Sequence, residues 1–494
     1  MSDNVLFTAP ISTGSVTPDH SKRNSLVINL MLVATFVVFL NETIIGVAIP
    51  RLMENLHIEA STAQWLSTSF MLTMAVVIPT TGWLMQRLNT RTVFILAMSL
   101  FTLGTLIAAL AAGFPALLAG RVVQASGTAI MLPLLMTTVM QLVPPQSRGK
   151  TMGNISIVMS VAPAAGPVIA GVILSAFDWR WIFIFVLPVA VLALVLGATR
   201  VQNVTETREV PLDSLSVVLS AFAFGGLIYG LSSFGQAAAG NAMVSPWIPV
   251  GVGISALGLF ILRQFILQRG DRAFLDLRTF TSRGFAVGII LMAILMAMLF
   301  GMIILLPIYT QNVLGLDPLP SGLLLAPGSL LMGVAGPFVG RLYDRVGPRP
   351  LLVPAAAWVS LVLWSMTLFN QNTPWYLVLV THIALSVGLA FMFTPLFTSS
   401  LGALKPQLYS HGAATIGTVQ QLAGAAGTAL SIALLTAGQF TFEKDGLSQV
   451  AAEAGGIHWA FTAGAIISVV AFAVTFFVPK PDPELAPNSE WARH

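Results

Sequence analysis

Three ionisable side chains lie inside long apolar runs of this 494-residue sequence: Glu42, Arg121 and His382. Glu42 belongs to the segment 40–50 and is the one acidic residue that we place within a hydrophobic span. A charged group near the bilayer centre costs about 2.5–3.5 kcal/mol, so a carboxyl group there indicates a functional role. Such a group can bind and release a proton when its surroundings change. The alternative is a structural Glu42 that pairs with a neighbour or reaches toward the interface.

Arg121 is the second charge inside an apolar run, at about the depth of Glu42 when each is counted from its helix end. A buried guanidinium stays protonated and is costly without partners. Arg121 therefore either bonds to helix carbonyls and to Gln124 or tunes the proton affinity of Glu42. His382 either titrates near neutral pH or is a hydrogen-bonded core residue.

The composition places these residues in a membrane protein. Hydrophobic residues make up 56% of the sequence and charged residues 9%, against about 25% charged in ordinary soluble domains. Together with the long apolar runs, this predicts an all-α polytopic membrane protein with fourteen transmembrane helices and short connections. The predicted spans are 26–50, 62–82, 92–112, 116–140, 150–175, 180–199, 214–234, 246–268, 284–310, 319–340, 350–370, 375–402, 412–438 and 457–479.

The longer polar linkers, 200–213 and 269–283, separate two spans from the rest. Residues 1–24 lack the apolar core of a cleaved signal peptide, so we expect the first span to insert by itself. The predicted organisation is a cytoplasmic tail over 1–25, a six-helix lobe over 26–199, linkers and two additional helices over 200–283, a second six-helix lobe over 284–479 and a cytoplasmic tail over 480–494.

Lys and Arg residues gather on one side of the predicted spans. Eighteen of the 23 fall in segments that face that side, whereas only Arg51, Arg180 and Lys444 fall in loops on the other. Cytoplasmic loops collect positive residues, so we expect both termini on the cytoplasmic side of an inner or plasma membrane. The net charge of +4 does not indicate nucleic-acid binding, because it is spread over short loops.

The two predicted lobes repeat each other. Residues 82–91 match 340–349 at an offset of 258, and residues 145–146 match 406–407 at an offset of 261. At the second offset Gly127 also matches Gly388, and Arg121 matches His382. Chance similarity between apolar helices is the alternative, but basic loops at fixed offsets favour a true repeat. Two intervening spans keep both halves in the same orientation, as in a two-lobed transporter with a midplane cavity.

Several segments together resemble the fourteen-span drug:proton antiporter branch of the major facilitator superfamily and, within it, the lincomycin-resistance type of exporter. The similarity covers nearly the whole chain. It rests on the two repeated loops and on four segments: LNETIIGVAIP at 40–50, RVVQASG at 121–127, APAAGPVIAG at 162–171 and WRWIF at 179–183.

This resemblance implies a secondary transporter that exports amphipathic drugs or toxic compounds in exchange for protons, without a cofactor. It implies that Glu42 and Arg121 take part in proton coupling, and we add His382 as a third candidate because its imidazole can titrate at physiological pH. It also identifies Gly166, Pro167 and Gly171 as an antiporter motif that seals the path against proton leak. The alternative for these three residues is helix bending and close packing alone.

The repeated loops resemble a conformational latch between the lobes, and plain cytoplasmic anchoring is the alternative. The residues concerned are Gly82, Arg87, Arg91, Gly340, Arg341, Asp344, Arg345, Gly347 and Arg349. Asp344 among three arginines can hold a charge-assisted network. The sequence departs from the family pattern at Asn41, where most relatives have Asp, and at Gln86 and Asn89 in the first loop. The first loop is therefore expected to be the weaker latch.

The substrate surface is expected among adaptable and polar side chains of the spans, although most methionines here would face lipid or the core. The candidates are Asn41, Gln124, Met292, Met296, Gln420 and Gln421. The expected partners are the lipid bilayer, small amphipathic substrates and protons, and we expect a monomer that binds no nucleic acid.

Other function classes fit less well. The chain has no cysteine, and its six histidines show no metal-binding spacing. Scattered ionisable groups do not make the clustered site of a membrane enzyme, and a receptor would usually add a sizeable soluble domain. An exporter of a physiological metabolite on the same fold remains the closest alternative.

Overall fold

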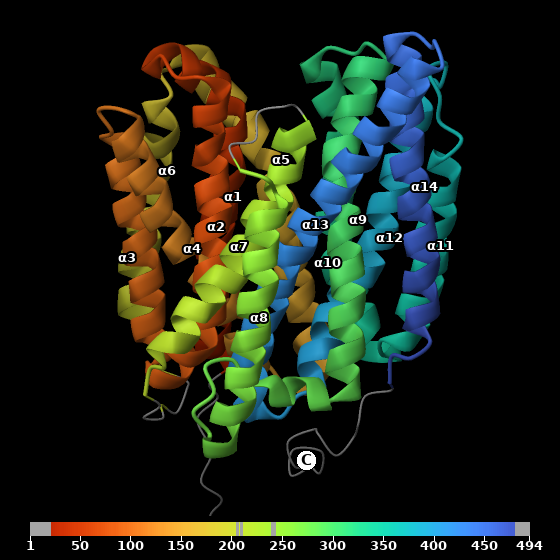
Figure 1. Cartoon of the computed structure of the whole chain (residues 1–494). Helices are drawn as coiled ribbons and strands as arrows, with labels where there is room; N and C mark the ends of the chain where they lie inside the picture. Colours follow the sequence, from red (N-terminus) through yellow and green to blue (C-terminus); the bar gives the residue numbers. More distant parts are fainter. Residues whose placement is uncertain (1–20, 204–206, 208–210, 239–243, 480–494) are drawn as a thin grey trace, which may run out of the picture.

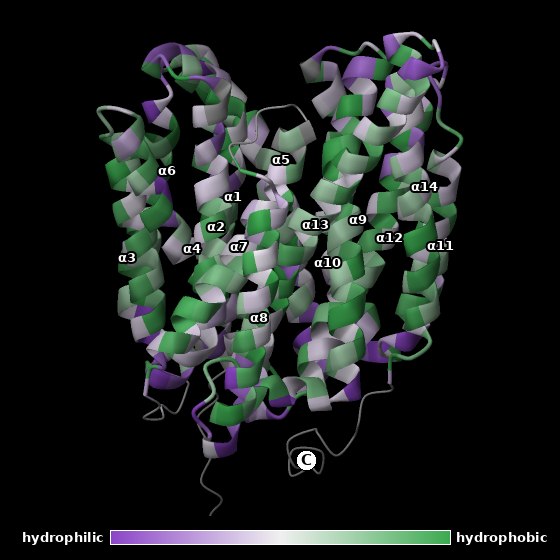
Figure 2. Ribbon diagram, viewed as in Figure 1, coloured by the Kyte–Doolittle hydropathy of each residue, from purple (hydrophilic) through white to green (hydrophobic). Residues whose placement is uncertain are grey.

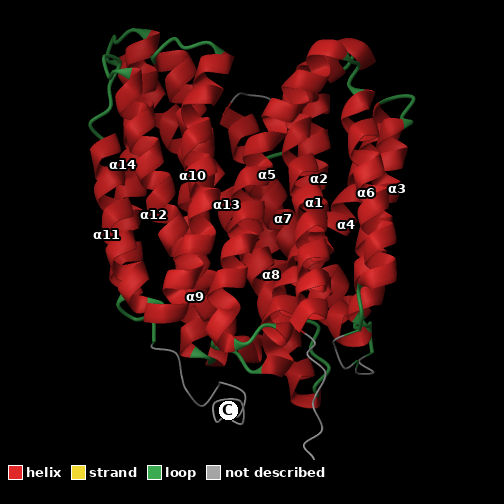
Figure 3. Ribbon diagram, turned by 180° about the vertical axis from the view of Figure 1, so that it is seen from behind, coloured by secondary structure: helices red, strands yellow, loops and turns green. Residues whose placement is uncertain are grey.

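The computed structural model describes residues 21–203, 207, 211–238 and 244–479, so residues 1–20 of the predicted first tail and the predicted tail 480–494 lie outside the described residues. All regular structure in these ranges is helical (Figure 3). Fourteen of the described helices are long and apolar enough to cross a membrane, which confirms the predicted fold class.

The membrane-length helices are α1 Ser21–Leu56, α2 Ala60–Arg87, α3 Thr90–Ala109, α4 Phe114–Leu142, α5 Arg148–Ala176, α6 Arg180–Arg200, α7 Ser214–Ala238, α8 Trp247–Leu267, α9 Arg283–Ile308, α10 Pro318–Val346, α11 Arg349–Met366, α12 Trp375–Gly402, α13 Tyr409–Lys444 and α14 Gln449–Thr475. Short helical turns lie between them: η1 Pro145–Ser147, η2 Gln268–Gly270, η3 Leu277–Thr281, η4 Tyr309–Val313 and η5 Pro406–Leu408.

Several helices extend past their predicted apolar spans. Helix α1 continues through Pro50 to Leu56, and α14 begins eight residues before the predicted position 457. At the start of α14 the Ser448 hydroxyl accepts a hydrogen bond from the Ala451 backbone N–H at 3.4 Å, which caps the helix. Apolar residues mark the part of a helix that fits lipid, whereas caps mark where the helix begins.

Successive helices run in opposite directions, so their connections gather at two ends. Polar residues are concentrated at both ends, and the middle of the helices is largely hydrophobic (Figure 2). We call the end that carries the starts of α5 and α13 and the ends of α2 and α10 the basic end. Its connections include those from α2 to α3, α4 to α5, α8 to α9, α10 to α11 and α12 to α13.

The helices form two lobes, α1–α6 and α9–α14, with α7 and α8 between them in sequence. The lobes meet where α5 packs along α10 and where α2 packs along α13. Helix α7 packs against both α2 and α13, and α8 packs against α7 (Figure 1). The ribbons of the two lobes lie closest toward the basic end, which is the lower end in Figure 1.

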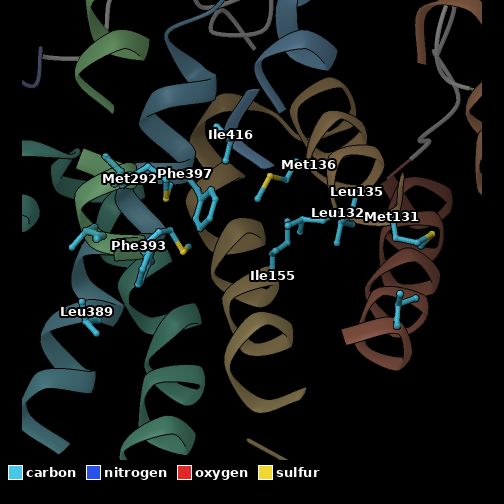
Figure 4. Packing of buried hydrophobic residues seen from close by; sticks show 14 of the residues in the cluster. Met131, Leu132, Leu135, Met136, Ile155, Met292, Leu389, Phe393, Phe397 and Ile416 are labelled. Atoms are coloured by element: carbon cyan, nitrogen blue, oxygen red, sulfur yellow. The ribbon is translucent and has the colours of Figure 1, made fainter. Parts of the chain in front are cut away.

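One buried hydrophobic cluster runs through both lobes. Met131, Leu135 and Met136 of α4 belong to it on one side, and Phe393 and Phe397 of α12 belong to it on the other (Figure 4). These side chains are at most 4% exposed. The lobes are thus joined by packing as well as by polar contacts.

Polar contacts fix the α7–α8 pair at its basic end. Arg263 of α8 donates two hydrogen bonds of 2.6 Å to the Asp213 carboxylate at the start of α7. Gln264 donates to the Ser216 hydroxyl at 2.8 Å. These hydrogen bonds from Arg263 lower the pKa of the Asp213 carboxyl to about 2, against the opposing effect of burial. These contacts hold α7 and α8 together as one antiparallel pair of helices.

Candidate functional site

Arg121 lies at the centre of a buried polar cluster in the first lobe. Its Nη1 donates to Asn41 Oδ1 of α1 at 3.1 Å and to Gln124 Oε1 of α4 at 2.8 Å. Gln124 in turn donates to the Thr105 hydroxyl of α3 at 2.8 Å. The guanidinium carbon lies 4.1 Å from the ring centre of Phe70 on α2. The cluster around Arg121 therefore joins four helices, and Arg121 is only 1% exposed.

Glu42 lies beside this cluster without a direct ion pair to it. Its charge interacts electrostatically with Arg121, yet no ion pair shorter than 4 Å joins the two among the ion pairs of the described chain. Its neighbour Asn41 is 1% exposed, whereas Glu42 keeps intermediate exposure. Two buried donors in the cluster, Arg121 Nε and Asn41 Nδ2, have no hydrogen-bond partner in the described structure. The site thus has unused donor capacity next to a carboxyl group.

Gly166 of α5 explains how the fifth helix reaches this site. A Cβ at this position would overlap the Thr43 hydroxyl of α1, which directly follows Glu42. Only glycine allows α5 and α1 to approach so closely here. Helix α5 continues through Pro167, which is exposed. At Gly171 a Cβ would meet nothing within 4 Å, so the packing alternative is wrong for that residue.

His382 lies away from the Arg121 cluster. It is half-buried on α12, and its Nδ1 lies against Gly328 of α10, where a Cβ would come within 2.6 Å of its ring. His382 Nδ1 is buried and has no hydrogen-bond partner among the described residues. The structure therefore does not bring His382 to Glu42 or Arg121, although both positions match in the internal repeat.

The candidate substrate residues are mostly packed. Met292 is 0% exposed and Met296 is 5% exposed, and both belong to the central hydrophobic cluster. Gln420 lies 4.0 Å from the sulfur of Met296, and Gln421 is more exposed than Gln420. Asn41 and Gln124 are engaged by Arg121 as described above. In this conformation the methionines act as core residues.

Two of the latch residues, Gly340 and Asp344, lie where α5 crosses α10, a contact that we call the first seam. A Cβ on Gly340 would overlap the backbone oxygen of Gly149, and a Cβ on Gly336 would lie 2.6 Å from that of Gly153. Each helix thus contributes two glycines four residues apart, a pattern that allows close helix contact. The Ser156 and Thr394 hydroxyls add a cross-lobe hydrogen bond of 2.7 Å.

Asp344 closes the first seam, but not through arginines. Its carboxylate accepts hydrogen bonds of 2.8 Å from the backbone N–H groups of Gly149 and Lys150. Gly149 and Lys150 belong to the first turn of α5, so the carboxylate also faces the positive end of the helix dipole. The expected network with arginines is wrong in its donors, because the free N–H groups of a helix start fit two carboxylate oxygens.

The other latch residues are placed separately. Arg349 donates to the Phe476 backbone oxygen at 2.9 Å, near the end of α14. Gly347 has a φ of +80°, which favours glycine, and its N–H donates to Tyr343 O at 2.8 Å where α10 ends. The Arg91 backbone N–H donates to Asn203 Oδ1 at 3.3 Å. Arg87, Arg341 and Arg345 are exposed at the basic end.

The matching contact of the other repeat lies where α2 meets α13, the second seam. The Gln86 side chain lies 2.7 Å from Nε2 of His411, and Gln86 matches Asp344 at the offset of 258. A Cβ on Gly82 would come within 2.9 Å of His411 Nδ1, which explains a glycine there. Arg148 and Tyr409, which match at the offset of 261, meet between the seams at 3.4 Å.

A cavity of about 1270 Å³ opens at the basic end of the second lobe, beside the first seam. Its wall includes Tyr343, Asp344, Thr398 and Ser399. The matching positions of the first lobe enclose only about 10 Å³. The two lobes are therefore unequal at the end where the latch lies.

The comparison with known proteins decides the family. A model of the Major Facilitator Superfamily matches residues 31–428. The chain belongs to the major facilitator superfamily. Proteins of this family are transporters, so this chain is a multi-pass membrane transporter and not an enzyme.

Its similar relatives include named drug-resistance proteins. The chain is 38% identical over 459 residues to the lincomycin resistance protein LmrB of Listeria monocytogenes, covering 92% of this chain and 96% of that protein. It is 37% identical to the uncharacterized MFS-type transporter YcnB of Bacillus subtilis, with 93% and 96% covered. It is 30% identical to the multidrug resistance protein B homolog of Mycobacterium tuberculosis, with 82% and 75% covered. These findings confirm the resemblance found in the sequence.

Solved structures agree on the fold. The human organic anion transporter MFSD10 (TETRAN) superposes with a TM-score of 0.63 at 15% identity, covering 92% of this chain and 99% of that one. The proton:xylose symporter XylE superposes with a TM-score of 0.61 at 15% identity, covering 93% and 97%.

Sequence reasoning missed two functional candidates. His411 gave no signal of its own, although it matches Lys150, which bonds Asp344 in the other repeat. The glycine pairs 149/153 and 336/340 are visible in the sequence and would have indicated the first seam.

Proposed function

We propose that this transporter exports small amphipathic compounds in exchange for protons, with Glu42 as the group that carries the coupling proton. The observation that carries the proposal is the arrangement at Glu42. A carboxyl group of intermediate exposure lies beside a buried guanidinium, and two donors of that cluster are unpaired. The names of the relatives, lincomycin and multidrug resistance proteins, support amphipathic drugs as substrates.

The chemistry follows from the competing effects on a carboxyl group. Proximity to the Arg121 guanidinium favours the charged carboxylate, whereas removal from water favours the protonated acid. A deprotonated Glu42 that moves toward Arg121 Nε and Asn41 Nδ2 would satisfy both unpaired donors. A protonated Glu42 has less reason to do so. A change in lobe arrangement that alters this distance therefore binds or releases a proton.

Alternating access supplies that change. The first and second seams close the basic end in this conformation, so the lobes must part there to open the other state. We propose that the basic end faces the cytoplasm, because it collects most Lys and Arg residues. A proton that enters down 100 mV releases about 2.3 kcal/mol, so one or two protons support a substantial substrate gradient.

Two variants in liposomes test the role of Glu42. Glu42→Gln keeps the size and resembles the protonated acid, so it should bind substrate yet lose export driven by a pH gradient. Arg121→Lys keeps a charge but not the planar fork, so it should shift the pH dependence more than binding. Glu54→Gln is the matched control, since Glu54 is an exposed residue of the same helix.

The readout is proton-driven export and binding for a panel of lipophilic cations, lincosamide-like compounds and amino acids. Wild-type export rates in Glu42→Gln would show that the proton takes another route, and His382 would be the next residue to change. Export of amino acids alone would favour the metabolite exporter over the drug exporter.

A further inference from the structure

The linker between α8 and α9, residues 271–282, lies across the second seam and is fixed there. Its residues Phe274 and Leu275 are at most 4% exposed and pack with Phe260 of α8 and Ala414 of α13. Gln264 Oε1 accepts hydrogen bonds from the backbone N–H groups of Phe274 and Leu275 at 2.9 and 3.1 Å. The linker is thus held by α8 on one side and meets the second lobe on the other.

His411 is the residue through which α13 contacts both the linker and α2. Its Nδ1 accepts a hydrogen bond from the Asp276 backbone N–H at 3.3 Å, and its Nε2 lies 2.7 Å from the Gln86 amide. Because Nδ1 accepts, a neutral ring carries its proton on Nε2. The Gln86 atom that lies 2.7 Å from Nε2 is the amide nitrogen, which is also a donor, so the two cannot bond as placed. Turning the Gln86 amide by 180° puts its oxygen at this position, where it accepts from the Nε2–H group. The neutral imidazole thereby joins three elements, with 2% of its surface exposed.

We propose that His411 is a proton-sensitive lock of the second seam, closed when its imidazole is neutral and opened when Nδ1 is protonated. A protonated Nδ1 points an N–H at the Asp276 N–H, so two donors face each other and the hydrogen bond to the linker is lost. The Nε2–H bond to Gln86 survives protonation. Release therefore begins at the linker, and it is favoured as the pH at the basic end falls.

When the pH falls, the proton binds to the His411 imidazole and not to the neighbouring Asp276 carboxylate. The Asp276 carboxylate is bound by Arg278, whose Nε and Nη2 donate to it at 2.9 and 2.6 Å. Burial acts to raise the pKa of the Asp276 carboxyl, but the hydrogen bonds from Arg278 outweigh it and leave that pKa lowered. Asp276 therefore stays ionised and paired over the range in which histidine titrates.

Among the described residues, the charges that act on the His411 ring are those of Asp276 and Arg278. Helix α2 presents the neutral Gln86, and the basic-end half of α4, residues 128–142, contains no ionisable side chain. On α7 and α8 the charges of Asp213 and Arg263 are bound to each other. The Arg278 guanidinium itself faces the ring electrostatically and is held by Asp276 and Asp271. The lock thus depends on one titrating group.

The test measures opening of the second seam, so its result is independent of whether Glu42 carries the coupling proton. The chain has no cysteine, which allows single reporters. Ala414→Cys places a thiol at a position that is 0% exposed in the closed seam. The full chain in lipid nanodiscs is labelled with a membrane-impermeant maleimide from pH 8 to pH 5.5. Gly270→Cys, exposed at the same end, corrects for the pH dependence of the thiol.

The corrected labelling rate should rise at least threefold as the pH falls. In a His411→Asn background it should be flat, because the amide oxygen still accepts from Asp276 but cannot titrate. Gln86→Glu retains His411 and places a carboxylate at Nε2, so the midpoint should move up by about one pH unit or more. Equal labelling profiles in the parent and in His411→Asn, or an unshifted midpoint in Gln86→Glu, would overturn the lock.

A second reporter covers the case in which the Ala414→Cys substitution itself opens the seam. If its thiol is labelled equally fast at every pH, Ile78→Cys on α2 serves as the reporter, because Ile78 is also buried. A labelling rate at Ile78→Cys that does not change with pH would also overturn the lock.

Discussion

The two seams occupy equivalent positions of the internal repeat but are built differently. In the first seam Gly149 meets Gly340 and Gly153 meets Gly336, so backbone lies against backbone. The equivalent residues of the second seam are Ser410, Gly82, Ala414 and Ile78. Only one of these four is glycine, and the contact passes through side chains such as His411.

The polar contacts differ in the same way. Asp344 in the first seam binds backbone N–H groups, which neither titrate nor move independently of α5. Gln86 in the second seam binds a histidine, which can titrate. The inserted α7 lies over the second seam, and the α8–α9 linker covers its basic end. Helices α7 and α8 and their linker to α9 thus cover the seam that lacks close backbone contact. The first seam is held by groups that do not titrate, whereas the second contains one that can.

Exchanging the residues of the seams should give the largest effect. Gly336→Ile introduces the residue found in the second seam, and its Cβ would meet the Gly153 backbone at 2.6 Å. We expect export per molecule in liposomes to fall at least tenfold, because the first seam cannot close. The matched variant Ile78→Gly removes a side chain at the equivalent position and should cost stability, about 2–4 kcal/mol, more than export. Equal export losses in the two variants would break the distinction between the seams.

Removing the charge of the first seam should give the next largest effect. Asp344→Asn keeps one acceptor but loses the carboxylate that faces the start of α5, where a charged hydrogen bond contributes about 1.5–3 kcal/mol. Gln86→Ala removes a contact to a neutral ring. Export by Asp344→Asn should therefore fall at least threefold further than export by Gln86→Ala, at matched abundance in the membrane. A larger loss in Gln86→Ala would place the stronger latch in the second seam.

Removing the contact between Asp213 and Arg263, which joins α7 to α8, should give the smallest effect, and it should appear in stability. The Asp213 pKa is lowered to about 2, so its pairing with Arg263 stabilises the fold above the ordinary carboxyl pKa and is lost as the pH falls toward 2. Asp213→Asn should lower the unfolding free energy by about 1 kcal/mol from pH 5 to pH 8. The difference from the parent should shrink below pH 4.

Asp178→Asn is the control for this measurement, because its pair with Arg180 is exposed on both sides. It should change thermal unfolding little at any pH. A deficit of Asp213→Asn that persists unchanged to pH 3 would show that this contact does not depend on the Asp213 charge.

The fold could be predicted because its signals are long and repeated. Apolar runs gave the fourteen spans, and fixed offsets gave two lobes with a pair of helices between them. The C-terminal end of α1 and the N-terminal start of α14 could not be read from apolarity, since both extensions carry charged residues yet are helical. The cluster of Arg121 with Gln124 was expected, whereas its bond to Asn41 depended on how α1 lies against α4.

Cross-lobe contacts could be predicted only in part. Asp344 does lie at a contact between the lobes, but its donors are backbone groups that no side-chain pattern reveals. The repeat paired Arg121 with His382, yet the second lobe places His382 against Gly328 in a different environment. His411 became a candidate only when the linker was seen to reach it. The internal repeat thus indicated which residues occupy equivalent positions, but it did not indicate which groups they contact.

The central claim is that transport requires the lobes to part at the basic end, and a reversible cross-link tests it most directly. The Ser156 and Thr394 hydroxyls lie 2.7 Å apart across the lobes, so Ser156→Cys with Thr394→Cys in this cysteine-free chain should form a disulfide. Oxidation should stop export by the double variant in liposomes, reduction should restore it, and neither single variant should respond. Unchanged export by the fully cross-linked protein would contradict the account.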